Sequence, residues 1–437
     1  MTTVLLFLLV LGVLVIVHEL GHFTVAKLAG VKVLEFGVGY PPRVFSIRRG
    51  ETDYTLNLLP LGGFVRMEGE DGPGAGARSF GAKSARARLA VLAAGPAMNA
   101  LLPIFLLTAV LMIPQQTTVA DVTVVSVAPG SPAEAAGLQP ADVIRSVDGR
   151  PVENTAALSS ALQLRLNADT GWVIERRGEP LEVRVSEVRS APPAGEGATG
   201  VRVANALTAV DALPTGSAAA QAGLLRGDAL LLAGERQVLT ADGLAEAGAA
   251  WAQTNPGEPM PLRVMRAGWL LTLYIPADAL AGLDVVALVV RPTERRAEGL
   301  WPALPHALRQ MGDVLVIFRN EISRWISGAS PVQISGPVGI AQATGEVARG
   351  GLSPLIAWAA LLSINLAIIN ILPLPALDGG RITLVLVELV RRGRRLAPEK
   401  ERLVHMMGFA LLMAGVAYVS IQDIARLLRG GSVLGGG

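Results

Sequence analysis

The chain of 437 residues contains no cysteine and only four histidines: His18, His22, His306 and His405. The absence of cysteine excludes disulfides, cysteine nucleophiles, thiolate zinc sites and iron–sulfur clusters. Charged residues make up 17% of the chain, below the roughly 25% of soluble domains. The 38 Lys and Arg nearly balance the 36 Asp and Glu, which argues against nucleic acid as a partner. Apolar residues reach 51%, so the sequence is not that of an ordinary soluble protein.

The apolar residues are concentrated in four windows that contain no charged side chain. A helix needs about 20 mostly apolar residues to cross the hydrocarbon core of a membrane. The N-terminal window has no basic start and no A-x-A cleavage site, so we expect it to be a retained span rather than a signal peptide. The predicted transmembrane helices cover about 2–23, 89–113, 352–377 and 403–422.

Positive charge predicts the orientation of these spans. Residues 24–88 hold ten Lys or Arg, and residues 391–402 hold six. By the positive-inside rule both segments belong in the cytoplasm. We therefore expect the N-terminus, residues 121–349 and the C-terminus outside, in a multi-pass membrane protein.

The segment between the second and third spans contains a repeat. Residues 131–152 align without gaps to residues 217–238 at an offset of 86, with eight identical positions. The surrounding sequence alternates apolar and polar residues, as short strands do. A unit of this length suits two tandem small α+β domains, which we place at 121–196 and 201–295 with the Pro- and Gly-rich stretch 191–200 as linker.

The sharpest motif is His18-Glu19-Leu20-Gly21-His22. On a helix, positions i and i+4 share one face, so both imidazoles can bind one zinc ion, and Glu19 can act as general base toward water at the metal. The alternative is a pair of polar residues at a span end that face water. Ionisable groups inside a membrane are costly and usually functional, which favours the metal site.

A catalytic zinc usually has a third protein ligand. His306 is predicted on the opposite side of the membrane, whereas His405 is predicted on the cytoplasmic side and remains a competitor. Asp378 is the better candidate, because it ends the third window in NILPLPALDGGR, where Pro373 and Pro375 break the helix. Broken helices at membrane depth are tolerated where they line a water-filled site. The alternative is that Asp378 caps the following helix.

The HELGH motif in a first span, combined with N-x-x-P-x-P-x-L-D-G at 370–379, resembles the site-2 protease family of intramembrane zinc metalloproteases. The resemblance covers essentially the whole chain. It implies Zn2+ held by His18, His22 and Asp378, with Glu19 activating water. It also implies that Asn370 holds the substrate backbone, although an amide that only packs helices is an equal alternative.

Other segments resemble the same family. Residues 31–69 resemble its membrane-associated β-hairpin, with RRGET as the turn, which could pair with an unwound substrate as an added strand. Gly95-Pro96 with Asn99 and the stretch 334–339 resemble further family patterns, and both could simply shape the backbone. The two repeats resemble PDZ domains, which we interpret as size-exclusion or gating modules, with capture of peptide ends as the lesser alternative.

These observations predict a polytopic α-helical membrane protein with four transmembrane helices, a β-hairpin loop and two tandem extracytoplasmic PDZ-like domains. The membrane protease would comprise residues 1–120 and 350–437, with an interfacial helix and linker at 300–349. The resemblance implies the activity of a zinc metalloendopeptidase in regulated intramembrane proteolysis, in a bacterial inner membrane with the active site toward the cytoplasm. By the same resemblance its substrates would be single-span membrane proteins, either anti-sigma factors or remnant signal peptides. The alternatives are a non-catalytic PDZ scaffold or adaptor and, less favoured, a transporter-like zinc protein.

Overall fold

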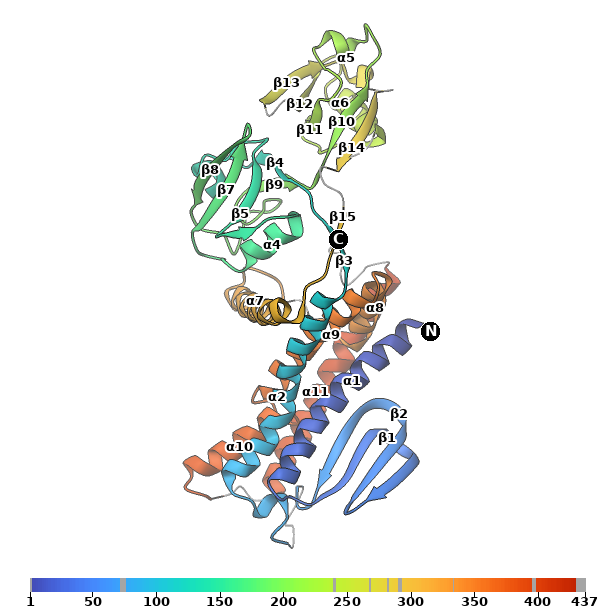
Figure 1. Cartoon of the computed structure of the whole chain (residues 1–437), viewed down its shortest axis with the longest axis vertical. Helices are drawn as coiled ribbons and strands as arrows, with labels where there is room; N and C mark the ends of the chain where they lie inside the picture. The colour runs from blue at the N-terminus through green and yellow to red at the C-terminus, as the bar shows by residue number, and fades with distance from the viewer. Residues whose placement is uncertain are drawn as a thin grey trace. The chain divides into compact units, whose positions relative to one another are not determined.

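The computed structural model describes residues 2–70, 76–238, 241–266, 269–280, 283–289, 293–332, 334–394 and 398–429. The chain forms two compact units (Figure 1). We call residues 1–114, 297–314 and 333–437 the membrane unit, and residues 115–296 with 315–332 the insert unit.

Among the described residues of the membrane unit, four helices are long and apolar enough to cross a membrane. They are α1 (Thr2–Leu28), α2 (Ala85–Met112), α9 (Leu352–Ile371) and α11 (Pro398–Leu428). Many of their apolar side chains are exposed, among them Phe105 and Leu411, as expected of side chains that meet lipid. The multi-pass character predicted from the sequence is therefore confirmed.

The third span is shorter than predicted. Helix α9 ends at Ile371 rather than near 377, because Pro373 and Pro375 lack the N–H that a continuing helix requires. The outer spans are longer than predicted: α1 continues to Leu28, and α11 extends beyond 403–422 at both ends. Charged residues in the terminal turns do not stop a helix, although they mark the edge of its apolar window.

Helices α1 and α2 approach closely at Gly21. A Cβ atom there would overlap the carbonyl group of Ala94 and lie 2.7 Å from Cγ of Met98. On its other side α2 packs against α9, where the hydroxyl of Ser363 donates a hydrogen bond of 2.8 Å to the carbonyl oxygen of Asn99. Helix α2 is thus fixed between the helix that carries the HELGH motif and the helix that leads to Asp378.

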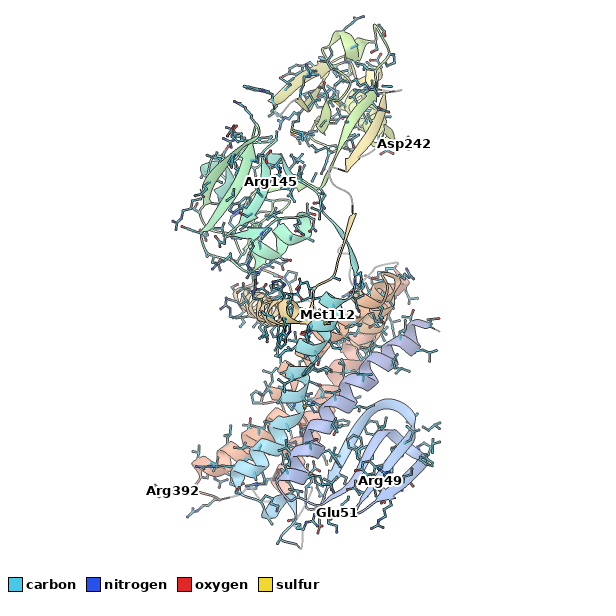
Figure 2. The ribbon with its side chains drawn as sticks, in the orientation of Figure 1. Arg49, Glu51, Met112, Arg145, Asp242 and Arg392 are labelled. Carbon is cyan, nitrogen blue, oxygen red and sulfur yellow. The ribbon has the colours of Figure 1, made fainter. Side chains whose placement is uncertain are left out.

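Strands β1 (Val33–Arg49) and β2 (Thr52–Met67) form a bent hairpin whose turn falls in the RRGET segment, at Arg49 and Glu51 in Figure 2. Residues 35–38 pair with both 53–56 and 63–66. The two long strands therefore give four rows, with residues 43–49 along one edge and 59–67 along the other. Helix α1 contacts β2.

Three further helices complete the membrane unit or extend from it: α7 (Leu300–Ser327), α8 (Pro337–Arg349) and α10 (Asp378–Val390). The segment 334–349, predicted as a linker, is therefore mostly helical. The buried carboxylate of Asp423 on α11 accepts hydrogen bonds from the N–H groups of Gly336 and Gly339, at 2.9 and 2.8 Å. These two bonds satisfy backbone N–H groups at the start of α8 that would otherwise lack partners.

The insert unit contains two antiparallel sheets, each with its own apolar core. The first has the order β8-β7-β5-β4-β9, with β6 paired to β5. Its elements are β4 (Val122–Val127), α3 (Pro132–Ala135), β5 (Val143–Val147), β6 (Arg150–Pro151), α4 (Thr155–Gln163), β7 (Thr170–Arg176), β8 (Glu179–Val185) and β9 (Val201–Ala204). Trp172 and Ile174 of β7 are buried in its core.

The second sheet has the order β13-β12-β11-β10-β14. Its elements are β10 (Ala206–Ala212), α5 (Ala218–Gln221), β11 (Ala229–Ala233), α6 (Ala241–Thr254), β12 (Met260–Arg266), β13 (Trp269–Ile275) and β14 (Asp284–Val289). A separate ribbon pairs β3 (Gln115–Thr118) with β15 (Thr293–Arg296).

The boundary between the two domains differs from the prediction. Strand β9 pairs with β4, with Thr123 opposite Ala204 and Val127 opposite Val201. The Pro- and Gly-rich stretch 191–200 is therefore a loop within the first domain, and the boundary falls after Ala204 rather than at 196–201. Local composition marks a loop but does not reveal which sheet the following strand joins.

The repeated motif forms the same local structure in both domains. Ser131 and Ser217 cap short helices by accepting hydrogen bonds from backbone N–H groups three residues later. Asp142 and Asp228 are 1% exposed, and each carboxylate binds a guanidinium group from the sheet, Arg176 at 2.7 Å and Arg266 at 2.6 Å. The spacing of the motif is thus explained by a helix cap and a buried ion pair.

Candidate metal centre

His18 and His22 lie one turn apart on the face of α1 that packs against α2, and both are buried. Their Nε2 atoms are 3.1 Å apart. Gly95 of α2 makes room for the two rings, since a Cβ atom there would lie 2.6 Å from Nε2 of His18 and overlap His22. The helical spacing predicted from HELGH is therefore accompanied by a close approach of both rings to α2, which a side chain at position 95 would obstruct.

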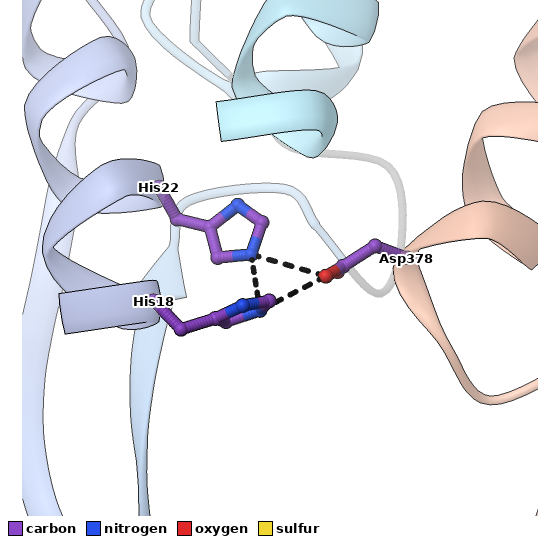
Figure 3. A group of neighbouring side chains, drawn as sticks. All are labelled: His18, His22 and Asp378. Atoms are coloured by element: carbon purple, nitrogen blue, oxygen red, sulfur yellow. Dashed lines mark hydrogen bonds and ion pairs between the residues drawn. The ribbon is translucent and has the colours of Figure 1, made fainter. Parts of the chain in front are cut away.

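Asp378 completes the group from the opposite side (Figure 3). Its Oδ2 atom lies 3.0 Å from Nε2 of His18 and 3.3 Å from Nε2 of His22. Leu377, not Asp378, is the N-cap residue of α10, and Asp378 is the first residue of that helix. The structure therefore does not support the alternative in which Asp378 caps the helix.

Asp378 is suited to remain ionised. Burial tends to raise the pKa of its carboxyl group, but the hydrogen bonds from His18 and His22 and their charge hold that pKa well below its usual range. Two imidazoles and one carboxylate are donors that zinc prefers. Donor atoms around tetrahedral zinc are separated by about 3.3 Å when the bonds are about 2.0–2.1 Å long, and the three separations here are close to this value. The residues present therefore fit a zinc ion.

The remaining nitrogen of each imidazole faces α2. Nδ1 of His22 donates a hydrogen bond of 2.8 Å to the carbonyl oxygen of Val91. Nδ1 of His18 lies 3.2 Å from the side-chain Nδ2 of Asn99. Such outer partners fix the ring orientation and tautomer of a metal ligand.

The loop that precedes Asp378 is held by α11. Ala376 has a positive φ of 77°, and its N–H donates a hydrogen bond of 3.2 Å to Nδ1 of His405. A Cβ atom at Gly408 would overlap Pro375, so the loop passes directly over this glycine. His405, the competing third ligand in the sequence analysis, contacts this loop rather than joining the cluster.

The other residues singled out in the sequence lie outside the cluster formed by His18, His22 and Asp378. His306 of α7 forms an ion pair of 2.7 Å with Glu298. Glu19 is half-buried beside the histidines, and its Cγ lies 3.4 Å from where a Cβ of Gly63 on β2 would stand. Asn370 lies in the last turn of α9, and its side chain forms no hydrogen bond within the described part of the chain. The proximity of Gly63 to Glu19 was not predicted from the sequence.

Most of the chain is similar to a known protein family. The model of peptidase family M50 matches residues 6–415. The chain belongs to peptidase family M50. This is the site-2 protease family, so the likeness inferred from the two motifs and the protease activity it implies are confirmed at the level of the family.

Several similar proteins are zinc metalloproteases named RasP, which are of the RseP-like type within this family. The chain is 29% identical to the regulator of sigma-W protease RasP of Bacillus subtilis, over 97% of this chain and 99% of the relative. It is 30% identical to the zinc metalloprotease RasP of Geobacillus kaustophilus, over 96% and 97%. The similarity therefore includes the insert unit as well as the membrane unit.

Two functional features of this M50 chain escaped the sequence analysis. Gly21 and Gly95 permit the close contact of α1 and α2 on which the metal centre depends. Gly21 is part of HELGH and Gly95 of the Gly-Pro pair, so both were visible as sequence letters. A glycine within an apolar helix gives no local signal of which helix will pack against it.

Proposed function

We propose that the chain is an intramembrane zinc metalloprotease whose zinc is held by His18, His22 and Asp378. The convergence of these three donor groups, from α1 and from the break before α10, is the observation that carries the proposal. Membership of family M50 and the zinc metalloproteases among the relatives support it. When bound, zinc would act as a Lewis acid toward a scissile carbonyl and toward water.

Glu19 is the proposed general base. It follows His18 on the same helix, so its carboxylate stands beside the metal centre without belonging to it. It would accept a proton from the attacking water and deliver that proton to the leaving amine nitrogen. The polypeptide of α2 covers the other face of the histidines, so the reaction would take place on the side of α1 that faces β2.

The β-hairpin supplies a docking edge for an unwound substrate. Residues 59–67 form an edge row of the sheet, and Gly63 in this row faces Glu19, whose Cγ would be 3.4 Å from a Cβ atom added at the glycine. A transmembrane helix hides its peptide bonds behind internal hydrogen bonds. An extended substrate segment added to this edge would have its main chain held by β2 and presented next to Glu19. Asn370 would contribute a further contact to the substrate backbone.

We propose single-span membrane proteins as substrates, either anti-sigma factors or remnant signal peptides. The relative named as a regulator of sigma-W protease supports the first class. The metal centre would face the cytoplasmic side, because the exposed Arg391, Arg392 and Arg394 follow α10, the helix that begins at Asp378 (Arg392 in Figure 2). The two domains of the insert unit would then be extracytoplasmic PDZ-like modules that restrict access by size.

Metal analysis combined with cleavage tests this function. The full chain and its Glu19→Gln variant are purified in lipid nanodiscs, their zinc content is measured, and each is incubated with a single-span test protein. We expect about one zinc per wild-type chain, cleavage within or beside the transmembrane segment, and loss of cleavage on addition of a chelator. A wild-type protein that binds no zinc and cleaves nothing would contradict the proposal and favour a PDZ scaffold. Cleavage that continues equally after chelation would contradict the proposed role of zinc.

A further inference from the structure

Asn99 of α2 has an unsatisfied buried oxygen beside the metal centre. The residue is 1% exposed, and its Nδ2 lies 3.2 Å from Nδ1 of His18. Its Oδ1 atom has no hydrogen-bond partner among the described residues. Buried polar atoms are nearly always hydrogen-bonded, so an orphaned amide oxygen at this place calls for an explanation.

The chemistry of His18 provides the explanation. Its Nε2 faces Asp378 and His22, and is therefore the nitrogen available to a metal. An imidazole that binds a metal through Nε2 carries its proton on Nδ1, which must then donate a hydrogen bond. In the present orientation of the Asn99 amide, its donor group Nδ2 faces Nδ1 of His18, which would also be a donor. Because the oxygen and nitrogen of an amide differ little in shape, a rotation of the amide by half a turn would bring Oδ1 to Nδ1 and place Nδ2 where Oδ1 now stands. The rotation would replace a contact between two donors by a hydrogen bond from Nδ1–H to Oδ1.

His22 shows the matching arrangement. Its Nδ1 donates to the carbonyl oxygen of Val91, which leaves Nε2 free to bind a metal. At the level of His18, the carbonyl oxygen of Asn99 accepts a bond from Ser363 of α9. The group of Asn99 in contact with His18 Nδ1 is instead its side-chain amide, which can supply the acceptor through Oδ1.

We propose that Asn99 is a positioning residue that accepts, through Oδ1, the hydrogen bond from Nδ1–H of His18 and so fixes the tautomer in which Nε2 binds zinc. The inference rests on the proposed zinc site. The bond from Ser363 to the Asn99 backbone fixes the helix segment from which the amide projects. The alternative role is a packing amide between helices, with no preference for oxygen or nitrogen toward His18.

Two substitutions distinguish an acceptor from a packing amide. Asn99→Leu keeps the approximate volume and removes all hydrogen bonding, whereas Asn99→Asp retains only acceptor atoms. The full chain is prepared in nanodiscs, and zinc affinity is measured by competition with a chromogenic chelator. We expect Asn99→Leu to weaken zinc binding about 10–100-fold, as loss of an outer partner commonly does. Asn99→Asp is expected to retain zinc far better than Asn99→Leu.

A matched control is available on the same helix. Thr108 is buried on α2, and its hydroxyl donates only to the carbonyl oxygen of Ile104 one turn earlier. Thr108→Val should leave zinc affinity unchanged. Thermal unfolding of each variant in the presence of chelator shows whether a weakened affinity reflects a weakened fold instead.

A second measurement is independent of the variants. With four histidines in the chain, selective 15N labelling gives few nitrogen signals, and His306→Gln and His405→Gln assign two of the residues. In the zinc-loaded wild-type protein we expect His18 Nδ1 to carry a proton that exchanges slowly with solvent. An unprotonated or freely exchanging Nδ1 would overturn the proposal even if the variants failed to fold.

The outcomes also separate this inference from the proposed function. If the wild-type chain binds no zinc, the proposed function fails. If it binds zinc and Asn99→Leu binds it equally well, or Asn99→Asp is as impaired as Asn99→Leu while well folded, only the role of Asn99 as acceptor is overturned.

Discussion

Gly95 of α2 lies so close to His18 of α1 that a Cβ atom at this glycine would be 2.6 Å from the ring nitrogen Nε2. The imidazoles of the metal centre are therefore positioned by the absence of a side chain on the neighbouring helix. Since real Cβ atoms do not approach other atoms so closely, any larger residue must displace a ring or separate the helices.

Gly95→Ala is expected to abolish stoichiometric zinc binding, because the added methyl group occupies the space of both histidine rings. Zinc content of the purified variant in nanodiscs measures the effect. Gly12→Ala on α1 is the control, since a Cβ atom there meets nothing within 4 Å. Normal zinc content in Gly95→Ala would show that the helices yield without loss of the site.

Glu19→Gln is expected to reduce cleavage by a factor of at least about 100 while zinc remains bound, since general base catalysis commonly contributes about 10²–10⁴ in rate. The amide keeps the shape of the side chain but does not accept a proton. Cleavage of the single-span test protein and zinc content are measured on the same preparation. Substantial turnover with zinc in place would exclude Glu19 as the base.

Asp378→Asn is expected to weaken zinc retention strongly, because a neutral amide replaces the carboxylate that faces both imidazoles. His405→Gln provides the comparison: His405 holds the preceding loop through the N–H of Ala376, and a glutamine oxygen can accept that bond. We expect His405→Gln to retain zinc. If the metal were lost from His405→Gln and kept in Asp378→Asn, the third ligand would have to be reassigned.

Asp142→Asn and Asp228→Asn are expected to destabilise the domain in which each lies by about 2 kcal/mol, through loss of charge-assisted hydrogen bonds to Arg176 or Arg266. Hydrogen exchange of the full chain should increase in one sheet and not in the other. Asp169→Asn is the control, because its ion pair with Arg184 is exposed on both sides and is expected to contribute little. Zinc content should be unaffected in all three variants.

Much of the architecture follows from local patterns. The apolar windows give the four spans, and the helical repeat places His18 and His22 on one face because their spacing matches one turn. Asp378 was identified from its motif and from the prolines before it, but its meeting with His18 depends on how α9 and α10 pack against α2. Such long-range packing is not encoded in any window of the sequence.

The errors have the same origin. The end of α9 was placed near 377 because the apolar run continues, although Pro373 stops the helix earlier. The domain boundary was placed at a Pro- and Gly-rich loop, although β9, which follows this loop, pairs with β4, a partner far back in the chain. The role of Gly95 depends on contact with another helix. Local rules predict elements and caps, whereas strand partners and helix contacts are decided by the whole fold.

The buried Asp–Arg pairs show that the two domains keep the same internal contact across segments of different length. The repeated motif keeps an offset of 86 residues, yet the arginine follows its aspartate by 34 residues in the first copy and by 38 in the second. The helix between them has 9 residues in the first domain and 14 in the second, and the ion pair is present in both. The same sheet contact is therefore compatible with helical segments of different length, which makes this segment a suitable place in either domain to introduce a tag or a reporter.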